Sequence, residues 1–247
     1  GALAATCYPD ADAFHLRVCS DVFNWMYIMD DRIEYGVIDA REAHESCILA
    51  LHDPINFDTE QLGGKMCKSF FSCFRKTAGP GCTERFIHRC ESAFVAAVKQ
   101  VDDRAKRHMY DLVSYIAMRR DVSGTKVAFT VIEFVARIDL SDEVMLHPVI
   151  MALEDAANDY IAWSNDILSY NKEQSRGDAH WHNIVAVLMH DRGLDLQGAI
   201  DYTGQLCKDV IQRLCTPPRR TTVPSSWKYC TDRPVDNLEL TVSISSA

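Results

Sequence analysis

The placement of proline constrains most strongly what this chain can fold into. Pro9, Pro54, Pro80 and Pro148 punctuate its body, and the remaining prolines crowd together after residue 216. An interior proline costs a helix about 3 kcal/mol, because it removes a backbone hydrogen bond and clashes with the preceding turn. The long proline-free tracts are therefore free to form helices.

Apolar residues in those tracts repeat with the period of a helix. Around residues 86–98, Phe86, Cys90, Ala93 and Ala97 fall on one stripe, whereas a strand would alternate apolar and polar positions. The pattern predicts an all-α fold in a single domain over residues 1–215. The expected helices span residues 12–35, 40–51, 65–76, 83–105, 108–120, 126–137, 147–175, 180–191 and 196–214.

Residues 216–247 differ in composition from the rest of the chain. They are rich in proline, serine, threonine and arginine, and they lack an apolar period that could pack a final helix. We expect an irregular tail there.

Composition narrows the class of protein. A net charge of −9 argues against a nucleic-acid-binding surface, and no apolar run is long enough for stable membrane insertion. The ten cysteines include no C-x-x-C spacing, which predicts reduced, mostly buried thiols in a cytoplasmic protein. The first residue, Gly1, is not methionine, so we expect the natural N-terminus to lie upstream. Either a monomer or a homodimer fits this composition.

The first candidate site is an acidic cluster at the end of an aromatic-rich tract. On a helix Asp30 and Glu34 lie one turn apart on the same face, and Asp31 adjoins them, so carboxylates could reach one hard cation such as Mg²⁺. A solvated helix face, paired locally with Arg32, explains the same residues. The cluster by itself does not separate these alternatives.

The second candidate site is more specific. Asn165, Ser169 and Glu173 follow one another at intervals of four, which places three oxygen donors on one stripe of a helix. Such a stripe can bind Mg²⁺ while leaving positions for phosphate oxygens. A solvated polar face would account for Asp166 and Asn171, but the apolar residues nearby indicate a largely buried helix.

A third candidate element surrounds Gly124. This glycine can end a helix in a left-handed conformation, which would place a helix end beside the site. Arg119, just before it, can bind phosphate oxygens with two nitrogens at once. A solvated helix C-terminus is the alternative explanation for Arg119.

Together these motifs resemble those of class I terpene synthases, most closely the fungal sesquiterpene synthases. The sequence DDRIE at residues 30–34 is similar to the family's aspartate-rich motif, and NDILSYNKE at 165–173 matches its Asn-Ser-Glu triad. The resemblance implies that Asp30 binds two of three Mg²⁺ ions with support from Glu34, and that Asp31 orients a basic partner. Asn165, Ser169 and Glu173 would hold the third ion.

The resemblance extends to the diphosphate-binding residues and covers roughly residues 12–214. Arg119 matches the family's diphosphate sensor, Val122 and Ser123 fall at its linker and effector positions beside Gly124, and Lys172 matches a lysine that contacts the diphosphate. The sequence RGD at 176–178 and HNIV at 182–185 continue the similarity. The implied fold is a class I terpenoid synthase helical bundle without some of its N-terminal and C-terminal helices.

The implied activity is that of a lyase: Mg²⁺-dependent ionisation of farnesyl diphosphate, cyclisation of the resulting cation and release of diphosphate. Such a cavity must be apolar and dry, because water would quench the cation, and aromatic faces stabilise positive charge. We expect Phe23, Met26, Tyr27 and Ile161 to line it, with core packing as the alternative for each.

The chain also departs from the family pattern. It has no Arg-Tyr dipeptide, which family members carry near the C-terminus, and only 29 residues precede Asp30. The alternative is therefore a catalytically impaired homologue that only binds diphosphate. A chain-elongating prenyltransferase is disfavoured, because a second aspartate-rich motif would be expected where the chain has Asn165 and Ser169.

Overall fold

All regular secondary structure in the described residues is helical. The structure is a computed structural model that describes residues 1–175 and 181–215, and these contain no strand. The helices are α1 (Ala2–Cys7), α2 (Ala13–Glu34), α3 (Ala40–His52), α4 (Leu62–Phe74), α5 (Pro80–Ala105), α6 (Leu112–Val122), α7 (Thr125–Ala136), α8 (Asp142–Met145), α9 (Pro148–Ser175), α10 (Ile184–Asp191) and α11 (Leu196–Cys215). The predicted all-α fold is confirmed. The predicted tail at 216–247 and the RGD segment at 176–178 lie outside the described residues.

Local side-chain chemistry explains where the long helices begin. Asp12, Asp39 and Asp111 accept hydrogen bonds from backbone N–H groups in the first turns of α2, α3 and α6. Pro80 and Pro148 occupy the first turns of α5 and α9, where a proline removes no helical hydrogen bond. The prolines that divide the sequence thus mark the starts of its two longest helices.

Each predicted helix agrees with the structure to within a few residues. The largest shifts are at the starts of α6 and α10, which begin only after their capping residues Asp111 and Asn183. The short helices α1 and α8 were not predicted, because six and four residues are too few to show a helical period.

Two apolar cores hold the helices together. The first joins α1 to α5 with α7 and contains a group of stacked rings, Phe71, Phe74, Phe86 and Phe134. The second joins α6, α9, α10 and α11. The predicted stripe on α5 contributes Phe86 and Cys90 to the first core, whereas Ala93 and Ala97 are half-buried and face a cavity.

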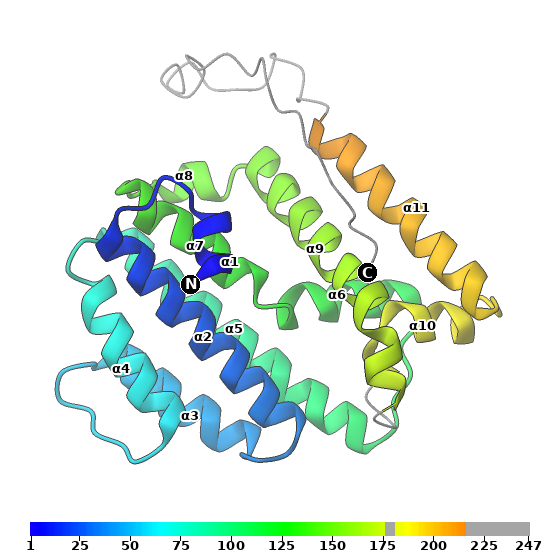
Figure 1. Ribbon diagram of the computed structural model, residues 1–247, viewed down its shortest axis with the longest axis horizontal. Coiled ribbons are helices and arrows are strands. Elements are labelled where there is room, and N and C mark those ends of the chain that lie inside the picture. Colours follow the sequence, from blue (N-terminus) through cyan, green and yellow to red (C-terminus); the bar gives the residue numbers. More distant parts are fainter. Residues whose placement is uncertain (176–180, 216–247) are drawn as a thin grey trace. The chain divides into compact units, whose positions relative to one another are not determined.

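The two cores meet along α5, α6, α7 and α9. Helix α5 contacts both α6 and α7, and each of these also contacts α9. Figure 1 shows α2, α3, α4 and α5 grouped on one side of this junction and α9, α10 and α11 on the other. Residues far apart in the sequence are therefore brought to opposite sides of the junction between the two cores.

The composition led to predictions about the cysteine thiols and about membrane insertion. The nine cysteines of the described part are free, and six of them are buried, in agreement with the predicted reduced thiols. Burial raises the pKa of the Cys90 thiol well above its ordinary value, which keeps it protonated. Within residues 1–175 and 181–215, no helix is both long and apolar enough to cross a lipid bilayer.

Candidate functional site

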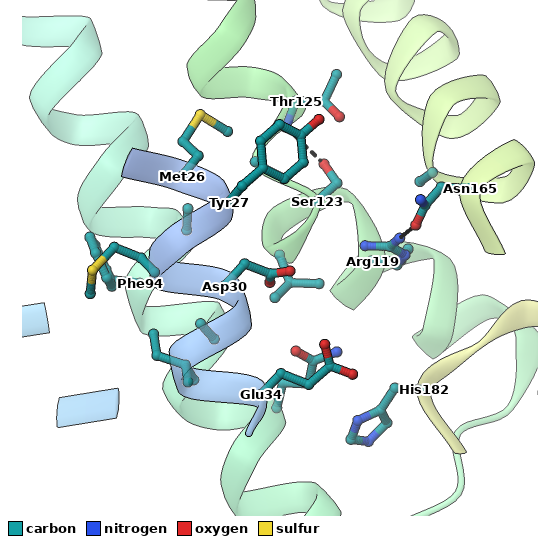
Figure 2. A pocket seen from close by; sticks show the side chains of 18 of the residues that line it. Met26, Tyr27, Asp30, Glu34, Phe94, Arg119, Ser123, Thr125, Asn165 and His182 are labelled. Carbon is teal, nitrogen blue, oxygen red and sulfur yellow. Dashed lines mark hydrogen bonds between the residues drawn. The ribbon is translucent and has the colours of Figure 1, made fainter. Parts of the chain in front are cut away.

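A cavity of about 340 Å³ opens where the two cores meet. Helices α2 and α5 form one wall, helices α6 and α9 contribute the other, and the segment between α6 and α7 also lines it. Figure 2 shows polar side chains from both walls pointing into the space between them. A volume of this size lies at the lower end of the range typical of small-molecule sites.

Asp30 and Glu34 line the cavity from α2 (Figure 2). Their spacing of four residues places them one turn apart on the same face of the helix. The Asp30 carboxylate is reached by solvent through the cavity but is enclosed by protein, and this burial together with the charge of Glu34 raises its pKa. Within the described residues it forms no hydrogen bond or ion pair. Asp31 is exposed and does not line the cavity.

Asn165 and Glu173 line the cavity from α9, and Asn165 faces α2 across it in Figure 2. Ser169 lies between them on the helix and is half-buried, but it is not a lining residue. Its hydroxyl donates a hydrogen bond to Glu173 Oε1 at 2.5 Å. The three residues of the predicted triad are therefore together, with Glu173 held by Ser169.

Arg119 reaches the cavity from α6 and is held by α9. Its Nε donates to Asp166 Oδ1 at 3.0 Å, and its Nη2 donates to Asn165 Oδ1 at 3.1 Å. Burial is the largest influence on the pKa of Arg119 and acts to lower it, but the charge and hydrogen bond of Asp166, together with Tyr115 and Glu173, outweigh burial, and the net shift is upward. The guanidinium therefore stays charged beside the proposed metal ligands.

Asp166 organises this wall of the cavity, of which it is itself a lining residue. Its side chain is 2% exposed and also accepts hydrogen bonds from the Tyr115 hydroxyl and the Ile184 backbone N–H. The interpretation of Asp166 as a solvated surface residue is wrong, because it lies on the buried stripe of α9 and carries the charge that balances Arg119. Asn171, the other residue so interpreted, is exposed.

Asn183 ties the end of α9 to the start of α10. Its Nδ2 donates to the backbone carbonyl of Asp166 at 2.8 Å and to Glu173 Oε2 at 3.0 Å, while its Oδ1 accepts from Val185 N–H. The residue is fully buried. One side chain thus caps α10 and fixes the carboxylate of Glu173, which Ser169 holds from the other side.

The break between α6 and α7 is built on Gly124, as expected. Gly124 has a φ of +71°, in the left-handed region that a residue with a side chain rarely adopts, and a Cβ atom there would lie 2.7 Å from Met26 Cε. The preceding Ser123 donates to Asn158 Oδ1 of α9 at 2.7 Å, and Asn158 Nδ2 donates to the Arg120 carbonyl at 2.7 Å. The break is therefore held against both α2 and α9.

The apolar part of the cavity is formed mainly by α2 and α5. Of the predicted lining residues, Met26, Tyr27 and Ile161 line it, together with Trp25 and Phe94, which were not predicted. The rings of Trp25 and Phe94 pack edge to face with centroids 5.8 Å apart. Aromatic faces of this kind can stabilise a cation in a site from which water is excluded.

Phe23 is not a lining residue, contrary to the expectation. Its ring stacks on Tyr8, with centroids 5.7 Å apart, and the Tyr8 hydroxyl donates to the Ala128 carbonyl of α7 at 2.8 Å. Tyr8 therefore connects α2 to α7 and packs against Phe23. Lys172 does not line the cavity either, and is exposed on α9.

The donor set is suited to a hard divalent cation. Carboxylates of Asp30, Glu34 and Glu173 and the amide oxygen of Asn165 supply oxygen atoms, which Mg²⁺ prefers. The unpaired Asp30 carboxylate beside Glu34 is a site where a cation would relieve repulsion. Among the described residues, no three acidic, histidine or cysteine side chains form a preassembled cluster.

Two further residues that were not predicted to line the cavity do so. Arg104, near the end of α5, and His182, just before α10, both line the cavity. Asp166, by contrast, does carry a signal in the sequence. Ala162, Asp166 and Tyr170 share one stripe of the helix, and a charged residue on a buried stripe needs a partner.

Comparison with known families identifies a match over most of the chain. Residues 21–213 match the family described as "Terpene synthase family 2, C-terminal metal binding". The matched range contains both candidate metal-binding faces and Arg119.

Curated relatives from basidiomycete fungi resemble the chain. Sesquiterpene synthase 3 of Postia placenta is 40% identical over 208 residues, which cover 84% of this chain and 56% of that protein. Sesquiterpene synthase Agr1 of Cyclocybe aegerita is 39% identical, covering 86% and 61%. Alpha-muurolene synthase of Coprinopsis cinerea is 38% identical, covering 87% and 52%. The chain thus spans little more than half the length of these three relatives.

Solved structures of similar fold agree with this match. The SVS_A2 protein, obtained by ancestral sequence reconstruction, superposes with a TM-score of 0.73 at 25% identity, covering 84% of this chain and 63% of that one. The structure of a-eudesmol synthase gives a TM-score of 0.73 at 22% identity, covering 85% and 69%, and shows likeness of fold alone.

Proposed function

Since this chain belongs to terpene synthase family 2, we propose that its helical region over residues 1–215 is a sesquiterpene synthase domain that converts farnesyl diphosphate into a cyclic product. The bond that breaks would be the carbon–oxygen bond between the farnesyl chain and diphosphate. Because diphosphate leaves with the electron pair of that bond, the enzyme would be a lyase. The relatives named as sesquiterpene synthases support this choice of substrate.

One observation carries the proposal above all others. The acidic face of α2, with Asp30 and Glu34, and the polar face of α9, with Asn165 and Glu173, line the same cavity. Arg119 stands beside Asn165 with its charge fixed by Asp166. This arrangement offers cation ligands and an anion-binding arginine at one place, as a diphosphate site requires.

The metal proposed for this site is Mg²⁺, as three ions. When bound, Mg²⁺ would act as a Lewis acid that neutralises the charge developing on the diphosphate leaving group. Asp30 and Glu34 would supply ligands from one wall, and Asn165, Ser169 and Glu173 from the other. For Ser169 this requires that its hydroxyl turn away from Glu173, to which it now donates.

Other residues of the chain would bind and orient the substrate or exclude water from it. Arg119 would donate hydrogen bonds to phosphate oxygens, and Asp166 keeps its guanidinium charged and oriented. Trp25, Phe94 and Met26 would exclude water from the allylic cation and shape its folding. The end of α6, held by Ser123 and Gly124, would face the same space.

Incubation of the 247-residue chain with farnesyl diphosphate and Mg²⁺ tests this proposal. The expected result is a volatile cyclic sesquiterpene, detected by gas chromatography with mass spectrometry, that disappears when EDTA replaces Mg²⁺. Geranyl diphosphate run in parallel establishes whether ten-carbon or fifteen-carbon substrates are preferred. Thermal stabilisation by diphosphate with no product from either substrate would favour a homologue that only binds diphosphate.

A further inference from the structure

Arg104 and His182 lie together in the cavity without the partners that buried polar groups normally have. Arg104 comes from the last turn of α5 and His182 from the segment before α10, and both line the cavity. Figure 2 shows the His182 ring on the side of the cavity that faces Glu34. The segments that supply them are far apart in the sequence, so only the folded chain brings them together.

The unpaired atoms are the imidazole nitrogens and one guanidinium nitrogen. His182 is 5% exposed, and neither Nδ1 nor Nε2 has a hydrogen-bond partner in the described structure. Arg104 Nε is also buried without a partner. Buried polar atoms are rarely left unpaired, because each loses its hydrogen bonds to water without replacing them. Two such groups side by side in a cavity indicate that a ligand completes them.

The charges of these groups define the kind of ligand. Burial, followed by the positive charge of Arg104, lowers the pKa of His182 to about 4, so the ring is neutral near pH 7 and offers one N–H donor. Arg104 remains charged, and it forms no ion pair with a described carboxylate. The ligand should therefore be an anion whose oxygens accept hydrogen bonds.

Arg119 and Arg104 differ in how far their guanidinium nitrogens are already hydrogen-bonded. Two nitrogens of Arg119 are already committed to Asp166 and Asn165, so it binds an anion as part of a fixed network. Arg104 lines the same cavity but is not part of such a hydrogen-bonded network, and its Nε has no partner. A phosphate group is an acceptor with several oxygens and negative charge, which matches one N–H from imidazole and the donors of a guanidinium.

We propose that Arg104 and His182 form a second phosphate-binding point, which holds the diphosphate group from the α5 and α10 side while Arg119 holds it from α6. The identity of the anion as a diphosphate rests on the function proposed above. Arg104 would add a positive charge at the leaving group, and the neutral His182 would add a hydrogen bond. Neither residue belongs to the acidic faces that would bind cations.

Titration calorimetry with inorganic diphosphate tests this point directly. The protein is the 247-residue chain, measured once in EDTA and once with Mg²⁺. Because a hydrogen-bonded charge contact is lost, Arg104→Gln is expected to weaken diphosphate binding at least about tenfold in both conditions. His182→Leu is expected to weaken it by a few-fold, since it removes a neutral donor. The control Arg213→Gln, on the exposed last turn of α11, should bind as the unmodified chain does.

Two further comparisons keep the outcome clear. If Arg104→Gln does not fold, as judged by circular dichroism, Arg104→Lys is used instead; it keeps the charge and should bind with intermediate affinity. Unchanged affinity in the folded Arg104 variant and in His182→Leu would overturn the phosphate-binding point, as would failure of the unmodified chain to bind diphosphate in either condition.

The test separates this inference from the proposed function. Diphosphate binding that depends on Arg104, without turnover of farnesyl diphosphate, would support the binding point and contradict the enzyme assignment. Turnover of farnesyl diphosphate, together with unchanged diphosphate affinity in Arg104→Gln, would support the enzyme assignment and contradict the binding point.

Discussion

Replacement of Asp30 by asparagine is expected to lower product formation from farnesyl diphosphate by at least about a hundredfold without loss of folding stability. Asp30 has no hydrogen bond or ion pair in the described residues, so the fold does not depend on its charge. Burial and the charge of Glu34 already disfavour the ionised form, as the raised pKa shows. Removal of that charge should therefore leave the free energy of unfolding unchanged or slightly increased, while removing a cation ligand.

Product yield per unit time and urea-induced unfolding are measured on the same preparation. Asp21→Asn is the matched control on the same helix, since Asp21 pairs with Arg17 on the surface, away from the cavity. It should retain activity within a few-fold of the unmodified chain. An Asp30→Asn variant that keeps more than about a tenth of the activity would contradict the role given to this carboxylate.

Replacement of Asp166 by asparagine is expected to have the largest effect on stability, a loss of about 3–5 kcal/mol in the free energy of unfolding. Asp166 is 2% exposed and accepts hydrogen bonds from Arg119, Tyr115 and the Ile184 backbone. Asparagine keeps the size of the side chain but leaves the Arg119 guanidinium without its balancing charge in a largely buried position. An unpaired buried charge is among the strongest destabilising changes that a single substitution can make.

The matched control is Asp102→Asn, which removes an acid from an exposed ion pair with Arg41 and should cost less than about 1 kcal/mol. Chemical denaturation measures both variants. In the double variant Arg119→Met with Asp166→Asn, part of the lost stability should return, because both charges are gone. A loss below about 1 kcal/mol for Asp166→Asn alone would show that the buried network does not hold the two helices together.

The helices were predictable because their determinants are local. Apolar periodicity and proline positions act within a few turns, and they placed the nine longer helices of the described chain to within a few residues. The left-handed conformation at Gly124 was also predictable, since glycine adopts it without strain. The motif residues Asp30, Glu34, Asn165 and Glu173 were expected at one site, and the structure places them on one cavity.

Residues brought in by tertiary packing could not be read from the sequence. Arg104 and His182 reach the cavity only because α5 and α10 both contact α6. Arg104 belongs to no motif, and the HNIV segment that contains His182 was given no role at the site. Phe23 has the right helical spacing from Asp30, yet Tyr8 from a distant turn covers it. Asp166 lies beside Asn165 in the sequence, but on the neighbouring stripe of α9, which is buried. Periodicity assigns a face to a residue, whereas the neighbour on that face depends on the whole fold.

The most direct test of the central claim is a crystal structure of the chain grown with Mn²⁺, in place of Mg²⁺, and inorganic diphosphate. The central claim is that the acidic face of α2 and the polar face of α9 bind cations and one diphosphate group across a single cavity. Anomalous scattering from Mn²⁺ is expected beside Asp30 and beside Asn165 and Glu173, with diphosphate between the two groups of ligands. Manganese bound elsewhere, or diphosphate outside this cavity, would contradict the account.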